Sequence, residues 1–558
     1  MHSATAAAAA LILLGTAVLS GTSRADETKP ALPKQPRIVN IYNFIRNSDY
    51  RLQNSEQILF EATANQIKLI KPTGLPATWA LQYDALINPK YQELLKEIGP
   101  NDEIAAWWEI PRPLVQKAGI KWRGHDHEWD STANVGFSPG YTPDERRKLV
   151  DVYMAEFKSV FKRYPQSVGS WYIDEVTLDY MARRYGVIAS CNCKDQVGTD
   201  GYTLWGGYWN QAYYPSRSNA YMPAQTKSGQ IDIPVFRMLG SDPIYQYGAA
   251  PGMSTLEPVY GNAGGSDKWV AWFMKGLIQG PSLAFAYTQA GQENSFGWDS
   301  MKTGLTLQVN LLAQQARSGE VQVMTLADAG KWFKVKYPLT PATSMVYLDD
   351  WKNQNRRTVW YNSRFYRANL LWQGETFFIR DIHRFDESVA SPTHDSALKT
   401  HSLAYTTLPV MDGSLWSGPA QAGIYPALLS ADGTATTPLA VDGLPVVTET
   451  GASELTIVQP LRDGGKFTLI CGESSLACAA EDTQGQPLPW VWEMKGAGDK
   501  MKNAIQEVRP AAITFKTDSG TYTASLQPGF GAIKQQDDGT IRLTPNAKGR
   551  LIFALGKQ

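Results

Sequence analysis

Residues 168–187 read VGSWYIDEVTLDYMARRYGV, and this stretch decides the fold because a strand and a helix follow each other directly. The apolar and aromatic residues of Ser167–Ile173 predict a buried strand. Asp174 can cap the helix that is predicted to begin near Val176. The same order of strand and helix recurs between residues 37 and 325, which indicates a parallel sheet.

Working outward from this stretch, the periodicity of apolar residues places the other elements. Predicted strands cover residues 37–45, 77–83, 103–110, 234–239, 282–288 and 321–325. Predicted helices cover residues 55–70, 91–98, 142–163, 268–278 and 301–318. Thr142-Pro-Asp-Glu145 is a good helix start, because Thr142 can cap and the acids favour the positive end of the helix dipole. About seven strand–helix units over roughly 300 residues favour a closed or nearly closed barrel over an open sheet.

The helical pattern fades after about residue 340. Short alternating segments follow, separated by Gly, Asp and Pro turns, at residues 358–361, 376–379, 455–458, 466–470, 512–516 and 521–526. These segments predict one or two β-sandwich domains. The predicted fold class is therefore α/β, with an irregular (β/α)7-type barrel over residues 26–340 and β-sandwich domains over residues 341–558.

The amino terminus predicts export. Residues 4–19, ATAAAAALILLGTAVL, are apolar but too few to span a bilayer comfortably. Small residues in Ser23-Arg24-Ala25 suit signal-peptidase cleavage, so residues 1–25 are predicted to be a signal peptide and the mature protein periplasmic or extracellular. The rest of the chain has no stretch of 18 apolar residues, and its 53 basic and 53 acidic residues favour neither a membrane nor a nucleic acid as partner.

Four cysteines remain, and an exported protein can form disulfides. Cys471 and Cys478 lie close together in a strand-rich stretch, so a local hairpin disulfide is plausible. We interpret Cys191-Asn-Cys193 as a structural pair or vicinal disulfide, because zinc sites use wider spacing with further ligands. The cysteines therefore predict neither a metal site nor a cofactor.

Acidic residues lie beside dense aromatic residues between Trp107 and Asp299. The segments are Trp107-Trp108-Glu109, Trp171-Tyr-Ile-Asp174-Glu175 and Gly291-Gln-Glu293-Asn294. Flat aromatic faces stack on sugar rings, and spaced carboxylates break glycosidic bonds. This belt predicts a carbohydrate-active enzyme whose substrate is a poly- or oligosaccharide.

The order of segments, with GLPATWALQYDAL at residues 74–86, resembles the irregular barrel of polysaccharide deacetylases and of glycoside hydrolase families 57 and 38. The resemblance covers residues 36–335. Residues 193–216 and 236–247 also resemble exported bacterial proteins of an uncharacterised branch of this superfamily. Deacetylases of this fold carry Asp-Asp after the first strand and His-x-x-x-His after the third. Here the first strand ends Tyr42-Asn-Phe44 and the third ends Trp108-Glu-Ile110, so the metal ligands of a deacetylase are missing.

Family 57 is more similar. Trp107-Trp-Glu109 is similar to its second motif, and Trp171–Asp174 places Asp174 in the position of its nucleophile. Residues 291–297, GQENSFG, are similar to its fourth motif, although the upstream Asp is replaced by Thr288-Gln289. The resemblance therefore implies Glu293 as the substitute general acid.

We predict Asp174 as nucleophile or base, Glu293 as general acid and Asp242 as the rival acid, with Glu175 and Glu109 positioning hydroxyls or tuning the pair. The predicted substrate-binding residues are Trp107, Trp108, His125, His127, Trp171, Trp205, Tyr208, Trp209, Tyr213 and Arg237. Structural interpretations stand beside these: Asp174 can simply cap a helix, and the aromatic residues 205–214 can form a small core under a loop. Residues 124–130, GHDHEWD, fit a divalent-metal site, a sugar-binding rim or a polar loop.

The leading hypothesis is a secreted glycoside hydrolase that uses a carboxylate pair. One alternative is a carbohydrate-binding protein on a degenerate barrel, because the acid of the fourth motif is displaced. A second alternative is a metal-assisted polysaccharide deacetylase or lyase that uses His125 and His127.

Overall fold

A nine-stranded sheet forms the first part of the computed structural model, which describes residues 35–199, 201–249 and 252–556. The strand order is β10-β1-β2-β3-β4-β5-β9-β8, with β11 also paired to β1, and every pairing except that of β8 is parallel. The strands are β1 (Arg37–Ile45), β2 (Thr78–Leu81), β3 (Glu103–Trp107), β4 (Ser167–Gly169), β5 (Ala189–Asn192), β8 (Ala212–Tyr213), β9 (Val235–Arg237), β10 (Ala286–Ala290) and β11 (Gln322–Met324). This nearly closed parallel sheet confirms the predicted α/β barrel. The predicted signal peptide lies outside the described residues.

A side chain joins the barrel between β9 and β10. Oε1 of Gln211 accepts a hydrogen bond from the backbone N–H of Tyr287 at 2.8 Å. The backbone oxygen of Gln211 accepts from the N–H of Arg237 at 3.0 Å. Gln211, which directly precedes β8, thereby links β10 to β9.

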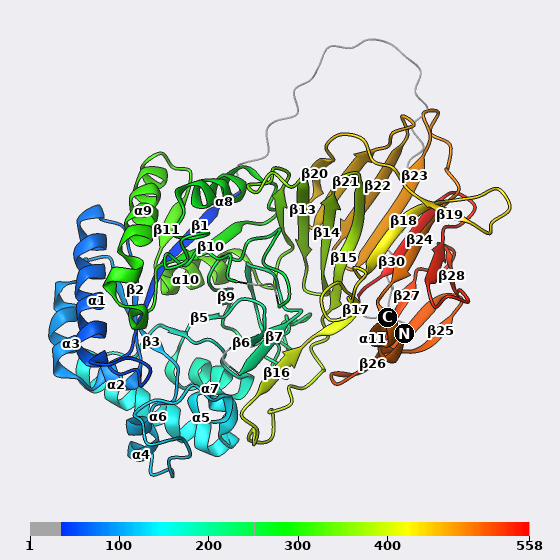
Figure 1. The fold of residues 1–558 in the computed structure, drawn as a ribbon. Helices are drawn as coiled ribbons and strands as arrows, with labels where there is room; N and C mark the ends of the chain where they lie inside the picture. The colour runs from blue at the N-terminus through cyan, green and yellow to red at the C-terminus, as the bar shows by residue number, and fades with distance from the viewer. Residues whose placement is uncertain (1–34, 200, 250–251, 557–558) are drawn as a thin grey trace, which may run out of the picture. The chain divides into compact units, whose positions relative to one another are not determined.

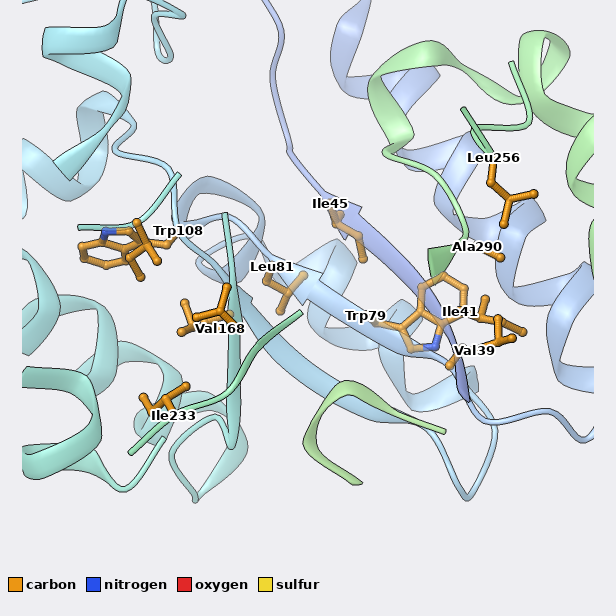
Figure 2. Packing of buried hydrophobic residues seen from close by; sticks show 14 of the residues in the cluster. Val39, Ile41, Ile45, Trp79, Leu81, Trp108, Val168, Ile233, Leu256 and Ala290 are labelled. Carbon is orange, nitrogen blue, oxygen red and sulfur yellow. The ribbon is translucent and has the colours of Figure 1, made fainter. Parts of the chain in front are cut away.

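Helices cover the outer face of the sheet (Figure 1). They are α1 (Ser55–Ile70), α2 (Tyr83–Leu86), α3 (Pro89–Leu94), α4 (Arg112–Lys117), α6 (Pro143–Phe161), α7 (Glu175–Tyr185), α8 (Asp267–Gln279) and α9 (Trp298–Arg317), whereas α5 (Ala133–Gly136) and α10 (Leu326–Lys336) contribute side chains to a second core. Val39, Ile41 and Ile45 of β1 belong to the outer core that the covering helices share, which Figure 2 shows with Trp79 and Leu81. The alternate residues of β1 face the second core inside the barrel, because successive side chains of a strand point to opposite faces.

Several predicted strands stop earlier in the structure, among them 103–110, which ends at Trp107. The predicted strand 77–83 ends at Leu81, because α2 begins at Tyr83. The predicted strand 167–173 ends at Gly169, where the hydroxyl of Ser170 donates to the backbone oxygens of Trp108 and Tyr172. The start of α6 is as predicted, with a complete capping box between Thr142 and Glu145.

Two antiparallel sheets form the second part of the chain as a sandwich, confirming the predicted β-rich fold. The larger sheet has ten strands: β12 (Thr343–Tyr347), β13 (Arg356–Asn362), β14 (Tyr366–Gln373), β15 (Thr376–Arg384), β17 (Leu408–Asp412), β18 (Gly423–Leu429), β19 (Thr436–Pro438), β24 (Trp490–Lys495), β28 (Ala532–Gln535) and β29 (Ile541–Thr544). The other has eight: β20 (Val446–Gly451), β21 (Glu454–Pro460), β22 (Lys466–Gly472), β23 (Ser475–Glu481), β25 (Ile505–Arg509), β26 (Ala512–Thr517), β27 (Gly520–Leu526) and β30 (Arg550–Ala554). Side chains from both sheets form one apolar core.

Three kinds of contact join the barrel segments to the sandwich segments: strand pairing, aromatic stacking and buried ion pairs. A small sheet pairs β7 (Tyr202–Trp205) with β6 (Gln196–Thr199) and, in parallel, with β16 (Leu403–Thr406). Trp209 stacks on Trp360 of β13, with ring centroids 3.8 Å apart and an interplanar angle of 3°. Arg367 of β14 is fully buried and bonds Asp195 at 2.5 Å and Asp381 at 2.8 Å. These contacts make residues 35–556 one continuous folded body.

The predicted disulfides are not formed. Cys191, Cys193, Cys471 and Cys478 are all free and buried. Cys471 pairs across the sheet with Leu476, and Cys478 pairs with Leu469, so the two thiols are not opposite each other in the ladder. Burial raises the pKa of Cys191 to about 12, which keeps that thiol protonated.

No helix in the described part of the chain is long and apolar enough to cross a membrane.

Candidate active site

One buried arginine holds three carboxylates at the carboxyl end of the barrel strands. Arg46 directly follows β1, and its Nε and Nη2 donate to the two oxygens of Glu109 at 2.8 and 2.7 Å. Its Nη1 donates to Glu293 at 2.8 Å and lies 3.9 Å from Asp49. Glu109 follows β3 and Glu293 follows β10, so loops from three strands meet here. This end of a parallel barrel is where functional groups usually gather.

A cleft of about 370 Å³ opens beside this group. Its acidic lining residues are Asp49, Glu257 and Glu293, and its aromatic ones include Trp171, Tyr202 and Tyr260. A smaller hollow shares Glu293 and Trp171 with the cleft and reaches Arg46, Glu109, Trp129 and Ser131. The cleft therefore combines carboxylates with aromatic faces around Glu293.

Stacked rings support Trp171. Trp107 lies parallel to Phe44, with centroids 3.9 Å apart. Trp171 meets both rings edge-on, at 5.7 Å from Trp107 and 5.2 Å from Phe44. Trp107 and Phe44 are buried, so of these three rings Trp171 is the one that lines the cleft.

Burial raises the pKa of Glu293 to about 7. The charge of Arg46 opposes this shift, but Arg46 already makes two hydrogen bonds to Glu109. The negative charges of Glu109 and Glu257 raise the pKa of Glu293 further. Glu293 can therefore carry a proton near neutral pH, as a general acid must.

Asp49 has the opposite tendency. Burial by itself would raise its pKa, but hydrogen bonds from Arg51 and the charge of Arg46 lower the pKa below the usual range. The guanidinium of Arg51 donates to both oxygens of Asp49, at 2.8 and 2.5 Å. Asp49 is therefore held as a carboxylate in the same cleft.

Glu257 is a third carboxylate of the cleft and is 4% exposed. The backbone N–H of the preceding Leu256 donates to the oxygen of Leu239 at 2.8 Å, which fixes this segment just beyond β9. The hydroxyl of Thr255 donates to Glu257 at 2.9 Å. Glu257 thus extends the acidic lining to a fourth strand end.

Asp174 lies outside the cleft. It is 0% exposed, and its Oδ1 accepts from the backbone N–H of Thr177 at 3.0 Å as the cap of α7. Arg146 donates to it at 3.0 Å and Ser138 at 2.5 Å. A nucleophile must reach a bound saccharide, and this carboxylate is saturated with internal partners. The placement fits the capping role and does not fit the predicted nucleophile.

We expect Asp174→Asn to destabilise the protein by about 3 kcal/mol, because it leaves the buried Arg146 without its counter-charge. Urea denaturation of the purified variant measures this. Asp144→Asn is the matched control, since Asp144 is exposed and makes only a surface pair with Arg147. A fully stable but inactive Asp174→Asn protein would contradict the structural role.

Glu175 and Asp242 are also buried away from the cleft. Glu175 accepts hydrogen bonds from Ser391 at 2.7 Å and contacts His394 at 2.9 Å, which fastens the loop after β15. Asp242 accepts from the indole N–H groups of Trp269 and Trp351 at 3.0 and 2.8 Å. Neither carboxylate lines the cleft around Glu293, so their placement does not fit the predicted roles of rival acid and tuning group there.

Most of the predicted sugar platforms are core residues. Trp205, Tyr208, Trp209 and Tyr213 are at most 2% exposed and lie among buried side chains. The indole of Trp205 donates to Asp412 at 2.7 Å, and Trp108 packs edge-on against Tyr153. Arg237 is buried and pairs with Asp195 at 2.6 Å. This placement fits the alternative of a core beneath a loop better than direct contact with a substrate.

The histidines lie on an exposed loop. His125 contacts Asp130 at 2.7 Å, and His127 stacks on Tyr50. Within residues 35–199, 201–249 and 252–556, no group of three or more His, Cys, Asp or Glu side chains is arranged to hold a metal ion. The described residues therefore do not fit the metal of a deacetylase.

Sequence reasoning missed Arg46, Asp49, Arg51 and Glu257. The first three lie in Arg46-Asn-Ser-Asp-Tyr-Arg51, directly after a well-predicted strand. Charged residues immediately beyond a barrel strand were the available signal. Glu257 follows no predicted strand, so only the folded chain reveals it.

No protein-family model matches the chain, and no curated protein is similar to it in sequence. A solved structure from Parabacteroides distasonis, described as a candidate glycoside hydrolase/deacetylase, is similar with a TM-score of 0.52 and 15% identity, covering 68% of this chain and 92% of that one. A candidate polysaccharide deacetylase from Mycobacterium smegmatis gives a TM-score of 0.35 and 10% identity, covering 57% of this chain and 97% of that one. The likeness to the Parabacteroides structure establishes a shared fold, and it is the barrel fold that the sequence resemblance implied.

Proposed function

We propose that this protein is an exported glycoside hydrolase that cleaves a poly- or oligosaccharide, with Glu293 as general acid and Asp49 as the second carboxylate. The observation that carries the proposal is that one cleft contains both groups with pKa values shifted in opposite directions. When the environments of two carboxyl groups shift their pKa values in opposite directions, the group with the raised pKa can act as the acid and the other as the base. The fold neighbour described as a candidate glycoside hydrolase/deacetylase is compatible with this chemistry.

The separation of the two groups supports the pairing. Nη1 of Arg46 lies 2.8 Å from Oε2 of Glu293 and 3.9 Å from Oδ2 of Asp49. The two oxygens are therefore at most ~7 Å apart, a bound that is compatible with the ~5–5.5 Å between the carboxyl groups of retaining glycosidases and excludes most of the wider range of inverting ones.

In the reaction, protonated Glu293 gives its proton to the glycosidic oxygen as the bond from that oxygen to the anomeric carbon breaks. Asp49 either attacks the anomeric carbon itself or removes a proton from the attacking water. Arg46 then neutralises the Glu293 carboxylate that remains, at 2.8 Å. Trp171 and Tyr260, which are only partly buried, supply flat faces for the sugar in the same cleft.

Two alternatives receive less support. A binding protein on a degenerate barrel would present splayed acids over a shallow face, whereas here Asp49, Glu257 and Glu293 line one cleft. A metal-assisted deacetylase needs a cluster of metal ligands, which the described part of the chain does not present at His125 and His127.

We expect kcat/KM to fall as the pH rises through about 7, because Glu293 then loses the proton that it must donate. On the acidic side, kcat/KM should fall only at a pH below the usual range of carboxylate pKa values, because the pKa of Asp49 is lowered. A pH–rate profile measures both limbs. A profile that stays flat from ~pH 6 to ~pH 9 would contradict the role of Glu293.

The decisive experiment incubates the purified mature protein with a panel of plant, bacterial and host glycans and analyses the products. New reducing ends support hydrolysis, and released acetate or an unsaturated product would point instead to a deacetylase or a lyase. The configuration of the first-formed sugar, read by NMR, separates attack by Asp49 from attack by water.

A further inference from the structure

Two exposed rings stack on each other outside the cleft. Tyr50 lies on the loop after β1 and is 44% exposed. His127 lies on the exposed loop after α4, and its ring is nearly parallel to Tyr50, with centroids 4.7 Å apart and an angle of 10°. The two rings therefore form a stacked aromatic pair on the surface, outside the cleft.

These rings continue into the inner part of the site. Tyr50 also packs against Trp129, at 5.9 Å between centroids, and its hydroxyl hydrogen-bonds the hydroxyl of Ser131 at 3.0 Å. Trp129 and Ser131 both line the hollow that contains Glu293. Arg51, which holds Asp49, lies 5.1 Å from the centre of the Trp129 ring. A ladder of rings therefore leads outward from the proposed catalytic pair.

We propose that Tyr50 and His127 form a second saccharide subsite, which binds a sugar ring of the same chain that is cut at Glu293. This inference rests on the proposed function and adds that the substrate is an oligomer extending beyond the cleft. A sugar fits because it presents a flat apolar C–H face to a ring and hydroxyls to its edge. Tyr50 and His127 offer both, since each has a flat ring and a polar edge, and the Arg51 guanidinium adds a donor beside the neighbouring Trp129 ring.

The proposal predicts a length-dependent loss of binding. In the Glu293→Gln background, where the ligand is not cut, Tyr50→Ala should bind neutral hexasaccharides about five- to tenfold more weakly. The probes are cellohexaose, xylohexaose, mannohexaose and N-acetylated chitohexaose, each beside its disaccharide, measured by calorimetry. Disaccharide binding should not change, because a disaccharide is too short to occupy both places.

Conservative variants distinguish the loss of the sugar-binding rings of Tyr50 and His127 from a general disturbance of their loops. Tyr50→Phe keeps the ring and should bind hexasaccharides almost like the parent, while His127→Ala should weaken them as Tyr50→Ala does. Glu128→Ala changes an exposed side chain of the same loop and is the control.

The two proposals can fail separately. If the wild type hydrolyses a glycan but Tyr50→Ala binds every probe as its parent does, the subsite is overturned and the hydrolase stands. Equal losses for disaccharides and hexasaccharides also overturn the subsite. If no glycan is cut yet the Tyr50-dependent binding of hexasaccharides is present, the subsite stands and the hydrolase fails.

Discussion

Glu293→Gln should lower kcat by about a thousandfold on natural glycosides while leaving KM nearly unchanged. The loss of a general acid typically reduces the rate by ~100- to ~10,000-fold. The amide keeps the volume of Glu293 and an oxygen that can accept the hydrogen bond from Arg46, so we expect the fold to persist. The measurement is steady-state hydrolysis of the best substrate from the glycan panel.

The leaving group makes this prediction specific. An aryl glycoside whose phenol leaves without protonation should lose far less rate in Glu293→Gln, because the missing proton is not needed. Asp299→Asn makes the same chemical change at an exposed residue six positions further along the chain and should leave kcat unchanged. Equal losses on natural and activated substrates would remove the general-acid role from Glu293.

Arg367→Leu should destabilise the protein by at least about 4 kcal/mol. Arg367 is 0% exposed and bonds Asp381 through two nitrogens, at 2.9 and 2.8 Å, and Asp195 at 2.5 Å. Removing the arginine leaves two buried carboxylates beside each other, and breaking a buried ion pair from one side costs about 3–5 kcal/mol. Chemical denaturation followed by tryptophan fluorescence measures the loss.

Two further variants test the reason for this loss. Arg367→Lys keeps the positive charge but loses the planar guanidinium. Its stability to denaturation should therefore lie between those of the wild type and Arg367→Leu. Arg462→Leu breaks an exposed pair with Glu375 in the sandwich and should leave the denaturation midpoint unchanged. If Arg367→Leu denatures at the same midpoint as Arg462→Leu, the buried network does not stabilise the protein.

Local sequence patterns predict most of the helices and strands of the fold. The apolar run of Arg37–Ile45 and the capping box at Thr142 are properties of short segments, so the sequence alone indicates them. The strand Ala189–Asn192 was missed because ASCN has neither an apolar run nor β-branched residues and gains its place by pairing on both sides. A strand that forms because of its tertiary pairing cannot be predicted from the local sequence pattern.

The site was harder to predict because an acidic residue beside a Trp has the same sequence signal in a cleft and in a core. Glu109 and Glu293, which the sequence also indicates as candidates, both follow strands and converge on Arg46. Asp174 also follows a strand, but Arg146 reaches it from α6 and seals it. The two kinds of carboxylate differ in the arginine that the fold places beside them, Arg46 in the cleft or Arg146 in the core. The spacing of residues along the chain does not indicate which arginine this is.

The contacts between β14, β15 and the barrel loops also bear on how such a protein can change over evolution. Asp195 comes from one part of the chain and Arg367 and Asp381 from the other, and Trp209 and Trp360 complete the same joint. Recombination that exchanged either part for a foreign partner would bring unmatched halves of this arrangement together. We therefore expect the two parts to have been inherited as a pair, with diversity between relatives arising in the rim loops rather than by shuffling at the junction.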